Sequence, residues 1–442
     1  MTTTDIAILG GSAAGITAAI TARRFHPDRR ITLIRREQQV PIPCGIPYIF
    51  GTLGDPAKNL IPDAVLEKSK VDLHIGEVET LDLEAKRLED GKGGIAYERL
   101  VLATGSSPVT PPLGGVDLPG VFPIHKDVTV LDRLRRELEE ARSVVIIGGG
   151  FIGIEFADEI AKLDKQVTVV EMADNCLNLS YDADFCAEME DHLRARGITI
   201  RTGARVTRIA GEDRAGAVVL DGGEELPAEV IILGIGAVPN VDLARRAGLA
   251  LGPLGAVAVD RSMRTSDPAV LACGDCAEKV SFFGGCPSPL RLASIAQHEA
   301  RIAGANAYGI RRESEGTVGV WSTAVGDLAM GTAGLTEKAA VEMGYAVTCG
   351  IAETPNRHPG CMPGAAPMKV KLVFDERTLV LLGGQVRGNA SIGEMINTIA
   401  ACVQTRMTAE TIARFQMGTH PALTASPIAY PLVNAAESAL CH

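Results

Sequence analysis

The sequence predicts an α/β protein in which one strand–turn–helix–strand pattern occurs twice and an α+β segment follows. Two runs of the chain fit this pattern, residues 5–34 and 143–171, each with a glycine-rich turn between its first strand and its helix. The segment after residue 316 alternates strand-like runs with helical periodicity and contains no such turn. At 442 residues the chain is too long for one ordinary core, so several domains are expected.

Composition and charge exclude several classes of protein. The formal net charge is −11, from 43 Lys and Arg against 54 Asp and Glu, so we expect no binding to nucleic acids or anionic membranes. The chain has no signal pattern at its start and no apolar run near the roughly 18 residues that span a bilayer. We therefore expect a cytoplasmic protein with reduced thiols. Cys273-x-x-Cys276 has no second pair at ligand spacing, so no metal site is expected.

The first unit contains a turn of small residues between the strand 5–9 and a helix that ends at Arg24. The members of this turn are Gly10, Gly11, Ser12, Ala13, Ala14 and Gly15. Small residues let the backbone approach a pyrophosphate, whose charge then lies at the helix N-terminus. The second strand, 31–34, is followed by Arg35 rather than by an acid. This unit is therefore either an adenosine site with unusual ribose contacts or a Rossmann-like strand with a solvated, charged end.

The second unit fits the dinucleotide pattern in full. Its turn and helix start supply the candidate cofactor residues Gly148, Gly150, Phe151, Ile152 and Gly153. Glu171 ends the next strand at the distance expected for holding a ribose 2′-OH. Because no arginine follows closely, a 2′-phosphate would meet a carboxylate, so the sequence favours NADH over NADPH. Two such units in one chain make chance matches an unsatisfactory explanation.

Three further segments carry a family resemblance. Residues 100–105 contain an Ala-Thr-Gly strand, residues 272–277 a Gly-Asp motif, and residues 232–240 a strand that closes the second unit. With the two glycine turns they resemble the pyridine nucleotide–disulfide oxidoreductase family, and most of all its single-cysteine branch. That branch holds coenzyme A disulfide reductases, NADH oxidases and NADH peroxidases. The resemblance implies FAD and NAD(P)H as cofactors, with Asp275 at the FAD ribityl chain. The other candidate cofactor residues outside the glycine turns are Arg35, Thr104, Gly105, Gly236 and Ala293.

The resemblance also implies the order of domains. Residues 1–115 and 241–315 would form an FAD-binding domain, and residues 116–240 an inserted NAD-binding domain. Residues 316–442 would form an α+β dimerisation domain, so a homodimer is expected. The sequence pattern agrees with that last assignment, because it predicts a strand over 368–374 and a helix over 392–405.

Cys44 is the candidate redox sulfur. It lies in the segment Pro43–Tyr48, which resembles the branch's Ser-x-x-x-Cys-Gly segment and which we expect to open a helix whose N-terminus favours a thiolate. The alternative is a buried structural cysteine. No cysteine precedes Cys44 and the next one is Cys176, so a local redox disulfide is excluded. A mixed disulfide with a small thiol, a persulfide and a sulfenic acid all remain open.

Several residues bear on the substrate. Arg24 resembles an arginine that meets nucleotide phosphates in coenzyme A disulfide reductases, although a solvated helix end explains it as well. Cys361 stands in a motif where those enzymes have a tyrosine, and it is a tentative substrate-side thiol; the alternative is that it packs in a loop. Whether Cys361 or Cys441 is redox-active stays open. His420-Pro421 resembles the segment that supplies a general acid in glutathione reductase-like members, and the alternative is a turn histidine. Phe151 is either an aromatic gate over the flavin or a packing aromatic.

These residues favour a reductase of a small-molecule disulfide, a persulfide or a coenzyme A-type thiol compound. An NADH oxidase or peroxidase that uses a cysteine sulfenic acid is the second hypothesis. By the same resemblance, an oxidase or peroxidase is expected to keep a histidine close after the first glycine turn. This hypothesis is disfavoured because the residues that follow the turn here, Ile16–Ala19, include no histidine. A flavin-carrying redox sensor or electron-transfer subunit without turnover is the third. The sequence leaves open which disulfide, persulfide or thiol is the substrate.

Overall fold

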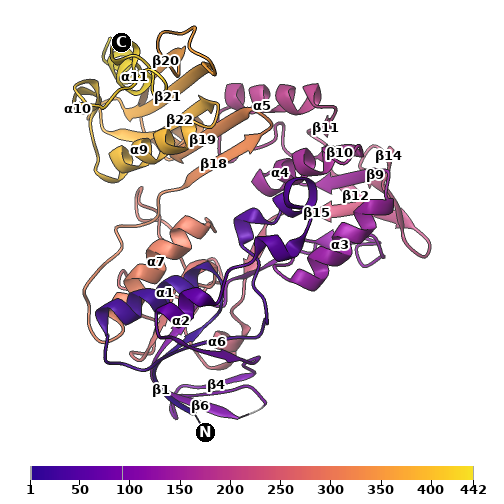
Figure 1. Cartoon of the computed structure of the whole chain (residues 1–442), viewed down its shortest axis with the longest axis vertical. Helices are drawn as coiled ribbons and strands as arrows, with labels where there is room; N and C mark the ends of the chain where they lie inside the picture. The colour runs from indigo at the N-terminus through magenta and orange to yellow at the C-terminus, as the bar shows by residue number, and fades with distance from the viewer. Residues whose placement is uncertain (1, 92, 442) are drawn as a thin grey trace. The chain divides into compact units, whose positions relative to one another are not determined.

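The computed structural model describes residues 2–91 and 93–441. The chain divides into two compact units (Figure 1). Unit 1 comprises residues 1–111, 122–140 and 235–317, and unit 2 comprises residues 112–121, 141–234 and 318–442. The predicted boundaries of the three domains stay a prediction.

Unit 1 is built on a parallel sheet with the order β3-β2-β1-β6-β17. These strands are β1 (Thr2–Leu9), β2 (Ile31–Arg35), β3 (Asp72–Ile75), β6 (Gly94–Leu102) and β17 (Val270–Ala272). The short strands β4 (Thr80–Asp82) and β5 (Arg87–Glu89) form a hairpin that pairs antiparallel with the start of β6. A separate ribbon pairs β7 (Ser106–Pro108) with β16 (Ala237–Pro239).

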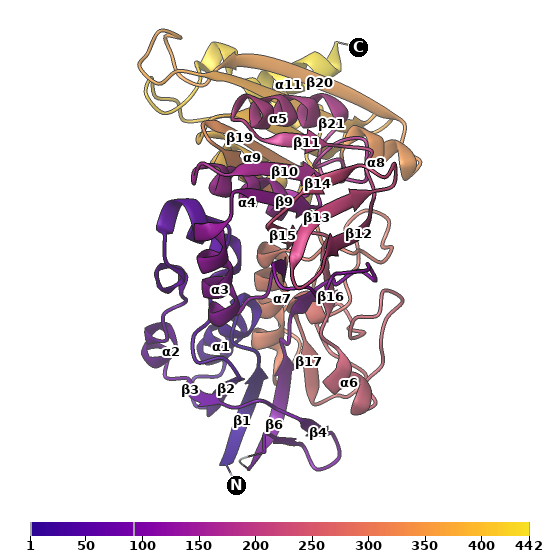
Figure 2. The same ribbon diagram turned by 90° about the vertical axis from the view of Figure 1, so that its right-hand side faces the viewer.

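Alternation along β1 explains how this sheet is covered. Ile6 and Ile8 face a core shared with α1 (Ala13–Phe25) and α7 (Ala293–Asn306), whereas Ala7 and Leu9 face the opposite core. The two helices lie side by side (Figure 2), and a Cβ at Gly304 would come within 2.5 Å of the Ala18 carbonyl oxygen. The remaining helices of the unit are α2 (Ala64–Lys68), α3 (Val128–Glu140) and α6 (Asp242–Arg246).

Unit 2 begins with a second parallel sheet, in the order β11-β10-β9-β15. Its strands are β9 (Ser143–Ile147), β10 (Gln166–Val170), β11 (Thr199–Arg201) and β15 (Val230–Leu233), with the helices α4 (Phe151–Ala161) and α5 (Ala183–Ala195) between them in sequence. A small antiparallel sheet follows, made of β12 (Val206–Gly211), β13 (Ala215–Leu220) and β14 (Glu225–Pro227).

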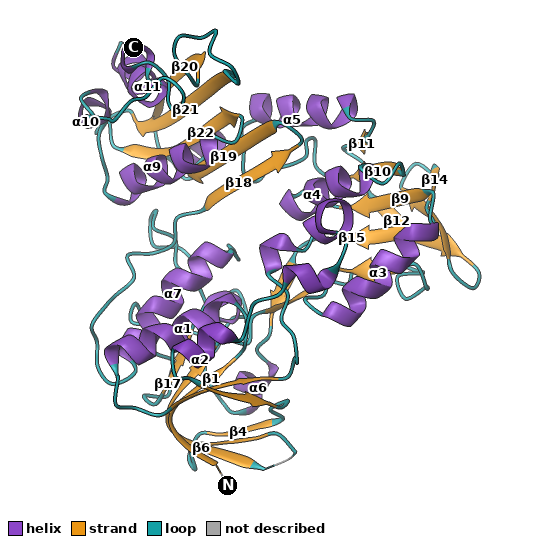
Figure 3. Cartoon of the chain, in the orientation of Figure 1, coloured by secondary structure: helices purple, strands orange, loops and turns teal. Residues whose placement is uncertain are grey.

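The C-terminal segment folds into an antiparallel sheet with the order β18-β19-β22-β21-β20 (Figure 3). These strands are β18 (Val320–Val325), β19 (Leu328–Gly334), β20 (Val347–Pro355), β21 (Pro367–Asp375) and β22 (Leu381–Gly388), and the helices are α8 (Glu337–Glu342), α9 (Ile392–Gln404), α10 (Ala409–Ala413) and α11 (Pro431–Leu440). The predicted strand over 368–374 and helix over 392–405 are confirmed as β21 and α9.

The two faces of this sheet differ in chemistry. Gly350, Leu372 and Gly384 are register partners on one face, and added Cβ atoms at the two glycines would meet α11 and α9 respectively. On the other face, the buried Lys371 and Gln385 both hydrogen-bond Asp182, the residue directly before α5. The apolar face thus carries the helices, and the polar face holds the N-terminus of α5.

Two predicted elements are wrong in detail. The strand over 232–240 is two short strands in different sheets, β15 and β16, because Gly236 between them adopts φ of +100°. The helix expected at Cys44 is a single 3-10 turn, Pro43–Gly45, followed by a π turn at Ile49–Leu53. Pro47 has no N–H to bond the Pro43 carbonyl four residues back, so an α-helix cannot start there.

Candidate functional site

The first glycine turn leaves its backbone open to a ligand at the N-terminus of α1. Gly10 has φ of +129°, and a Cβ there would lie 2.1 Å from the Ala103 carbonyl oxygen. A Cβ at Gly15 would lie 1.9 Å from the Gly10 oxygen. The helix begins at Ala13 after Ser12, whose side chain makes no capping hydrogen bond. Helix N-terminal N–H groups beside a crowded glycine turn fit the pyrophosphate of FAD.

Arg35 packs across this turn with its guanidinium already engaged. The side chain is 1% exposed, and a Cβ at Gly11 would lie 2.4 Å from its Cδ. The guanidinium donates two hydrogen bonds to the Asp63 carboxylate, at 2.7 and 2.8 Å, and two more to the Glu37 and Gln38 carbonyls. The Arg35 side chain therefore packs directly against the glycine turn, and its role toward the FAD ribose stays a prediction.

The strand ends β6 and β17 bring the Ala-Thr-Gly and Gly-Asp segments together within unit 1. Thr104 donates to the Asn240 carbonyl at 2.7 Å, and Gly105, at φ of +71°, accepts from the Asn240 N–H at 2.9 Å. Asp275 accepts from Ser106 Oγ at 2.7 Å and has the Lys126 Nζ at 3.7 Å. These contacts hold both segments at the carboxyl ends of parallel strands, where such sheets bind ligands.

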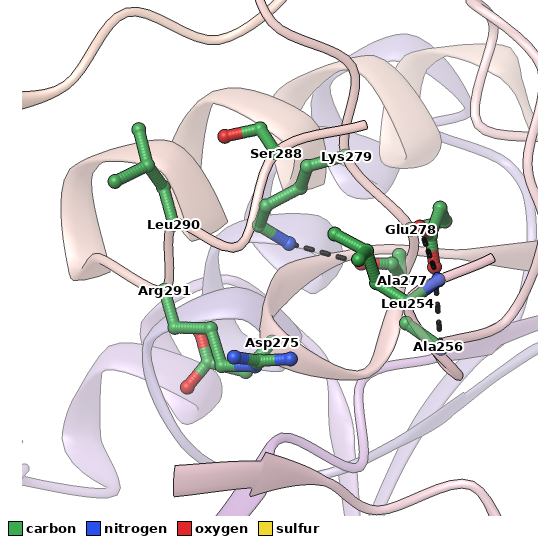
Figure 4. A pocket seen from close by; sticks show the side chains of 9 residues that line it. All are labelled: Leu254, Ala256, Asp275, Ala277, Glu278, Lys279, Ser288, Leu290 and Arg291. Atoms are coloured by element: carbon green, nitrogen blue, oxygen red, sulfur yellow. Dashed lines mark hydrogen bonds between the residues drawn. The ribbon is translucent and has the colours of Figure 1, made fainter. Parts of the chain in front are cut away.

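A pocket lies beside Asp275 (Figure 4). It is lined by Leu254, Ala256, Asp275, Ala277, Glu278, Lys279, Ser288, Leu290 and Arg291. The Arg291 Nε in this lining is buried and has no hydrogen-bond partner among the described residues. A buried donor left open beside a carboxylate indicates a site that a polar ligand completes. Ala293, two residues further on, starts α7.

Cys44 is exposed and lies in a loop that two hydrogen bonds attach to Asn59. The Ile42 N–H donates to the Asn59 carbonyl at 2.9 Å, and the Asn59 side chain donates back to the Ile42 carbonyl at 2.9 Å. Gly45 must be glycine, because a Cβ there would lie 2.0 Å from Asn59 Oδ1. Val40 occupies the place of the serine in the branch's motif, so that part of the resemblance is wrong. No disulfide joins any of the ten cysteines in the described chain.

The second glycine turn is closed on one side by Glu171. The Glu171 carboxylate accepts the Gly149 N–H at 2.6 Å and the Ala173 N–H at 2.8 Å, which fixes it at the end of β10. A Cβ at Gly153 would lie 1.9 Å from the oxygen of Gly148, a residue with φ of +109°. Gly150 has open space where its Cβ would be. This is the same crowded geometry as in the first turn, now with an acid beside it.

The first residues of α4 are Phe151 and Ile152. The Phe151 ring stacks on Trp321 at 5.9 Å and 12°, and it lies 6.0 Å from the Tyr181 ring. Ile152 is 49% exposed. Because both aromatic partners of Phe151 belong to unit 2, its packing role has direct support, and its role as a gate stays a prediction.

The Cys361 and His420 loops lie against each other in unit 2. The His358 N–H donates to the Pro421 carbonyl at 3.2 Å, and His358 Nδ1 donates to the Thr424 carbonyl at 3.1 Å. His420 Nδ1 accepts the Ala422 N–H at 3.2 Å. The neutral His420 ring therefore carries its proton on Nε2, which leaves Nε2–H as a donor. Cys361 and His420 are both exposed.

Arg23 and Arg24 have different surroundings, although they are adjacent. Arg23 donates to the carbonyls of Ser69, Lys70, Pro27 and Arg29, and so it ties down the end of α1. Arg24 is exposed, and no ion pair or hydrogen bond engages its side chain in the part of the chain that is described. Of the two, Arg24 is the one available to an anionic substrate.

Sequence reasoning missed three groups near these sites. Lys279 and Glu299 form a buried ion pair under the Gly-Asp motif. Glu155, one turn into α4, accepts from Thr323 Oγ1 at 2.8 Å, and burial raises its pKa to about 7. Lys279 and Glu299 are 20 positions apart in the sequence, and Glu155 and Thr323 are 168 positions apart. The only available signal was a charged residue in an otherwise apolar stretch, as at Glu155.

Comparison with known proteins identifies the family. The model described as pyridine nucleotide-disulphide oxidoreductase matches residues 4–300, and the model of that family's dimerisation domain matches residues 320–428. The chain belongs to the pyridine nucleotide-disulphide oxidoreductase family. It is thus an FAD- and NAD(P)H-dependent oxidoreductase, and the predicted fold class, with two Rossmann-like domains and an α+β dimerisation domain, is confirmed.

Several relatives within this family are close over nearly their whole length. The chain is 34% identical over 411 residues to an NAD(P)H coenzyme A polysulfide/persulfide reductase of Pyrococcus horikoshii, covering 91% of each chain. It is 30% identical over 448 residues to an NADH oxidase of Methanocaldococcus jannaschii, covering 98% of each. The solved structure of an NAD-dependent persulfide reductase from A. fulgidus matches with a TM-score of 0.91 at 29% identity, over 99% of this chain and 83% of that one.

The described residues contain neither a metal-binding cluster nor a membrane-spanning helix. Among residues 2–91 and 93–441, no group of three or more His, Cys, Asp or Glu side chains is placed to hold a metal ion. Within the same ranges, no helix is long and apolar enough to cross a membrane.

Proposed function

We propose that this enzyme uses NADH to reduce the sulfur–sulfur bond of a small disulfide or persulfide, with Cys44 as its single redox sulfur. The observation that carries the proposal is an exposed cysteine in a loop anchored to the FAD-binding unit, with no second cysteine near it in sequence. The relatives named as persulfide reductases support this substrate class. We also infer that the protein works as a cytoplasmic homodimer through residues 316–442.

The proposed chemistry has two halves. The Cys44 thiolate attacks one sulfur of the substrate, forms a mixed disulfide or persulfide, and releases the other sulfur as a thiolate or hydrosulfide. FAD, when bound, accepts a hydride from NADH and supplies the two electrons that return Cys44 to a thiolate. One NADH and one proton thus convert a disulfide to two thiols, or a persulfide to a thiol and hydrogen sulfide. His420 Nε2–H is the proposed proton donor to the leaving sulfur, and Arg24 the contact for an anionic group such as a coenzyme A phosphate.

The residues that hold FAD in this proposal come from unit 1. They are Gly10, Gly11, Ser12, Ala13, Ala14, Gly15, Arg35, Thr104, Gly105, Asp275 and Ala293, with Gly236 in the connecting loop. The NADH site in unit 2 comprises Gly148, Gly150, Phe151, Ile152, Gly153 and Glu171. Cys361 is proposed as a substrate-side thiol because its loop touches the His420 loop.

Anaerobic turnover tests this function. NADH should be oxidised when coenzyme A disulfide or coenzyme A persulfide is added in the absence of oxygen. Oxidation that occurs only with oxygen would favour the second candidate function, an NADH oxidase, which the likeness to the Methanocaldococcus jannaschii protein supports. Flavin reduction by NADH with no turnover of either kind would favour a redox sensor or electron-transfer subunit.

The nicotinamide preference can be predicted from Glu171. Its carboxylate is fixed by two backbone N–H groups, and the residue after it, Met172, is exposed and uncharged. A 2′-phosphate would therefore meet the fixed negative charge of this carboxylate. We expect kcat/KM for NADH to exceed that for NADPH by about ten-fold or more, which corresponds to ~1.4 kcal/mol.

Steady-state kinetics with both nucleotides checks this preference. Glu171→Gln keeps a hydrogen-bond acceptor but removes the charge, and it should raise the relative efficiency of NADPH. Glu212→Gln, which changes an exposed carboxylate elsewhere in unit 2, is the control and should leave the ratio unchanged. Equal efficiencies in the unchanged enzyme would mean that the carboxylate does not meet the ribose.

His420→Asn should slow disulfide turnover without affecting flavin reduction. The variant loses the imidazole Nε2–H donor, and general acid catalysis contributes about 10²-fold or more to such steps. We expect kcat to fall by about that factor, while rapid-mixing measurements show an unchanged rate of flavin reduction by NADH. His298→Asn, which changes an exposed histidine of unit 1, is the control. A full kcat in His420→Asn would remove this residue from the mechanism.

A further inference from the structure

A buried ion pair lies directly under the Gly-Asp motif. The Lys279 and Glu299 side chains are each 2% exposed, and Lys279 Nζ donates to Glu299 Oε2 at 3.3 Å. Glu299 comes from α7, whereas Lys279 lies five residues after Gly274. Burial penalises the charged form of the acid and raises the pKa of Glu299 to about 7. The neighbouring charges are Lys279 itself and Asp275.

The pair holds both sides of one residue of the motif. Glu299 Oε2 accepts the Gly274 N–H at 2.8 Å, and Lys279 Nζ donates to the Gly274 carbonyl at 2.7 Å and to the Ala277 carbonyl at 3.1 Å. Figure 4 shows the last of these contacts in the pocket beside Asp275. The oppositely charged side chains of Lys279 and Glu299 therefore hold the buried side of the 3-10 turn Gly274–Cys276, which carries Asp275.

The turn is also held against the FAD-binding helix. Gly274 has φ of +77°, and a Cβ there would lie 2.8 Å from the Cβ of Ala14 in α1. Asp275 accepts from Ser106 on the outer side. A small displacement of Gly274 would thus move Asp275 relative to the first glycine turn, because the two segments are in direct contact.

A buried ion pair is a poor device for stability alone. Removing two charges from water costs about as much as their attraction returns, and well-packed apolar residues in their place are often neutral or stabilising. What an apolar pair cannot do is hold a peptide N–H and a peptide C=O at fixed positions. The position of this pair therefore matters more than its strength.

We propose that Lys279 and Glu299 are positioning residues that set the Gly274–Asp275 turn for FAD, and so control FAD affinity and the flavin potential. This rests on the proposed role of Asp275 at the FAD ribityl chain. Neither residue contacts the cofactor in this account; both act through the backbone of Gly274.

The test replaces the pair by apolar residues in the double variant Lys279→Met/Glu299→Leu. Two quantities are measured: FAD release from diluted holoenzyme, and the midpoint potential of the bound flavin. We expect FAD binding to weaken by about ten-fold or more and the potential to shift. A folded variant whose FAD affinity and potential both match those of the unchanged enzyme would overturn the proposal. If the double variant does not fold, the single variant Glu299→Gln is tested by the same two measurements. We expect a smaller loss of FAD affinity in that variant. An unchanged FAD affinity and an unchanged flavin potential would contradict the proposal.

Two companion variants separate the possible failures. Lys371→Met/Asp182→Leu removes another ion pair, in unit 2, and should leave FAD affinity and the flavin potential unchanged. If this variant lost as much FAD affinity as Lys279→Met/Glu299→Leu, the effect would be a general one of removing buried charge, and the proposal would be overturned. Asp275→Asn tests the ligand itself. An unchanged FAD affinity in Asp275→Asn would overturn the role of Asp275, whereas a loss there with none in Lys279→Met/Glu299→Leu would overturn only the positioning role.

Discussion

Cys44→Ser should abolish reduction of the disulfide or persulfide while FAD binding and flavin reduction by NADH remain. A serine hydroxyl cannot form the mixed disulfide or the persulfide, and no second cysteine lies near position 44 in sequence to replace it. We expect turnover to fall by about 10³-fold or more, equal to ~4 kcal/mol of barrier. Anaerobic stopped-flow measurements separate the half-reactions, because the flavin should be reduced by NADH and then stay reduced when substrate is added.

Cys286→Ser is the matched control for this variant. Cys286 is the other exposed cysteine of unit 1, and it lies in a hairpin where its thiol contacts the Phe283 carbonyl. Its replacement should leave both half-reactions unchanged. Substantial turnover in Cys44→Ser, or a comparable loss in Cys286→Ser, would show that the redox sulfur has been misassigned.

Gly10→Ala should prevent FAD binding and destabilise unit 1. The residue needs φ of +129°, and the new Cβ would lie 2.1 Å from the Ala103 carbonyl oxygen, so either the turn or the end of β6 must move. We expect a loss of about 3 kcal/mol or more in unfolding free energy, since strain and overpacking add here. Urea unfolding and the FAD content of the purified protein measure the two effects.

Gly248→Ala controls for the backbone conformation alone. Gly248 also has a positive φ, +87°, but nothing lies within 4 Å of its added Cβ. The alanine there should cost only about 1 kcal/mol and leave FAD bound. Equal losses in the two variants would mean that the close approach at Gly10 is not what the turn requires.

The two nucleotide-binding units could be predicted because their signals are local. The strand, the glycine turn and the helix follow one another within 25 residues or so, and each small residue reports a close approach of neighbouring backbone. The glycines at positions 10, 15 and 153 do make such approaches. Spacing also predicts Glu171, although no local pattern indicates that its carboxylate accepts the Gly149 N–H.

The errors and omissions have a common cause, which is contact between distant segments. Arg35 ends its strand where an acid is usual, and only the fold shows that Asp63, 28 positions away, occupies its guanidinium. Phe151 stacks on Trp321, and Lys279 meets Glu299, through contacts that no local pattern encodes. The incorrect prediction of a helix at Cys44 has a different cause. Pro47 lies in the same local segment, and its missing N–H already argues against that helix.

Mass spectrometry of peptides from the treated protein tests the central claim most directly. The protein is treated with coenzyme A persulfide without oxygen, digested, and compared before and after one equivalent of NADH. The account predicts a sulfur or coenzyme A adduct on the peptide that contains Cys44, and the loss of that adduct when NADH is added. An adduct on another cysteine, or one on Cys44 that persists while NADH reduces the flavin, would contradict it.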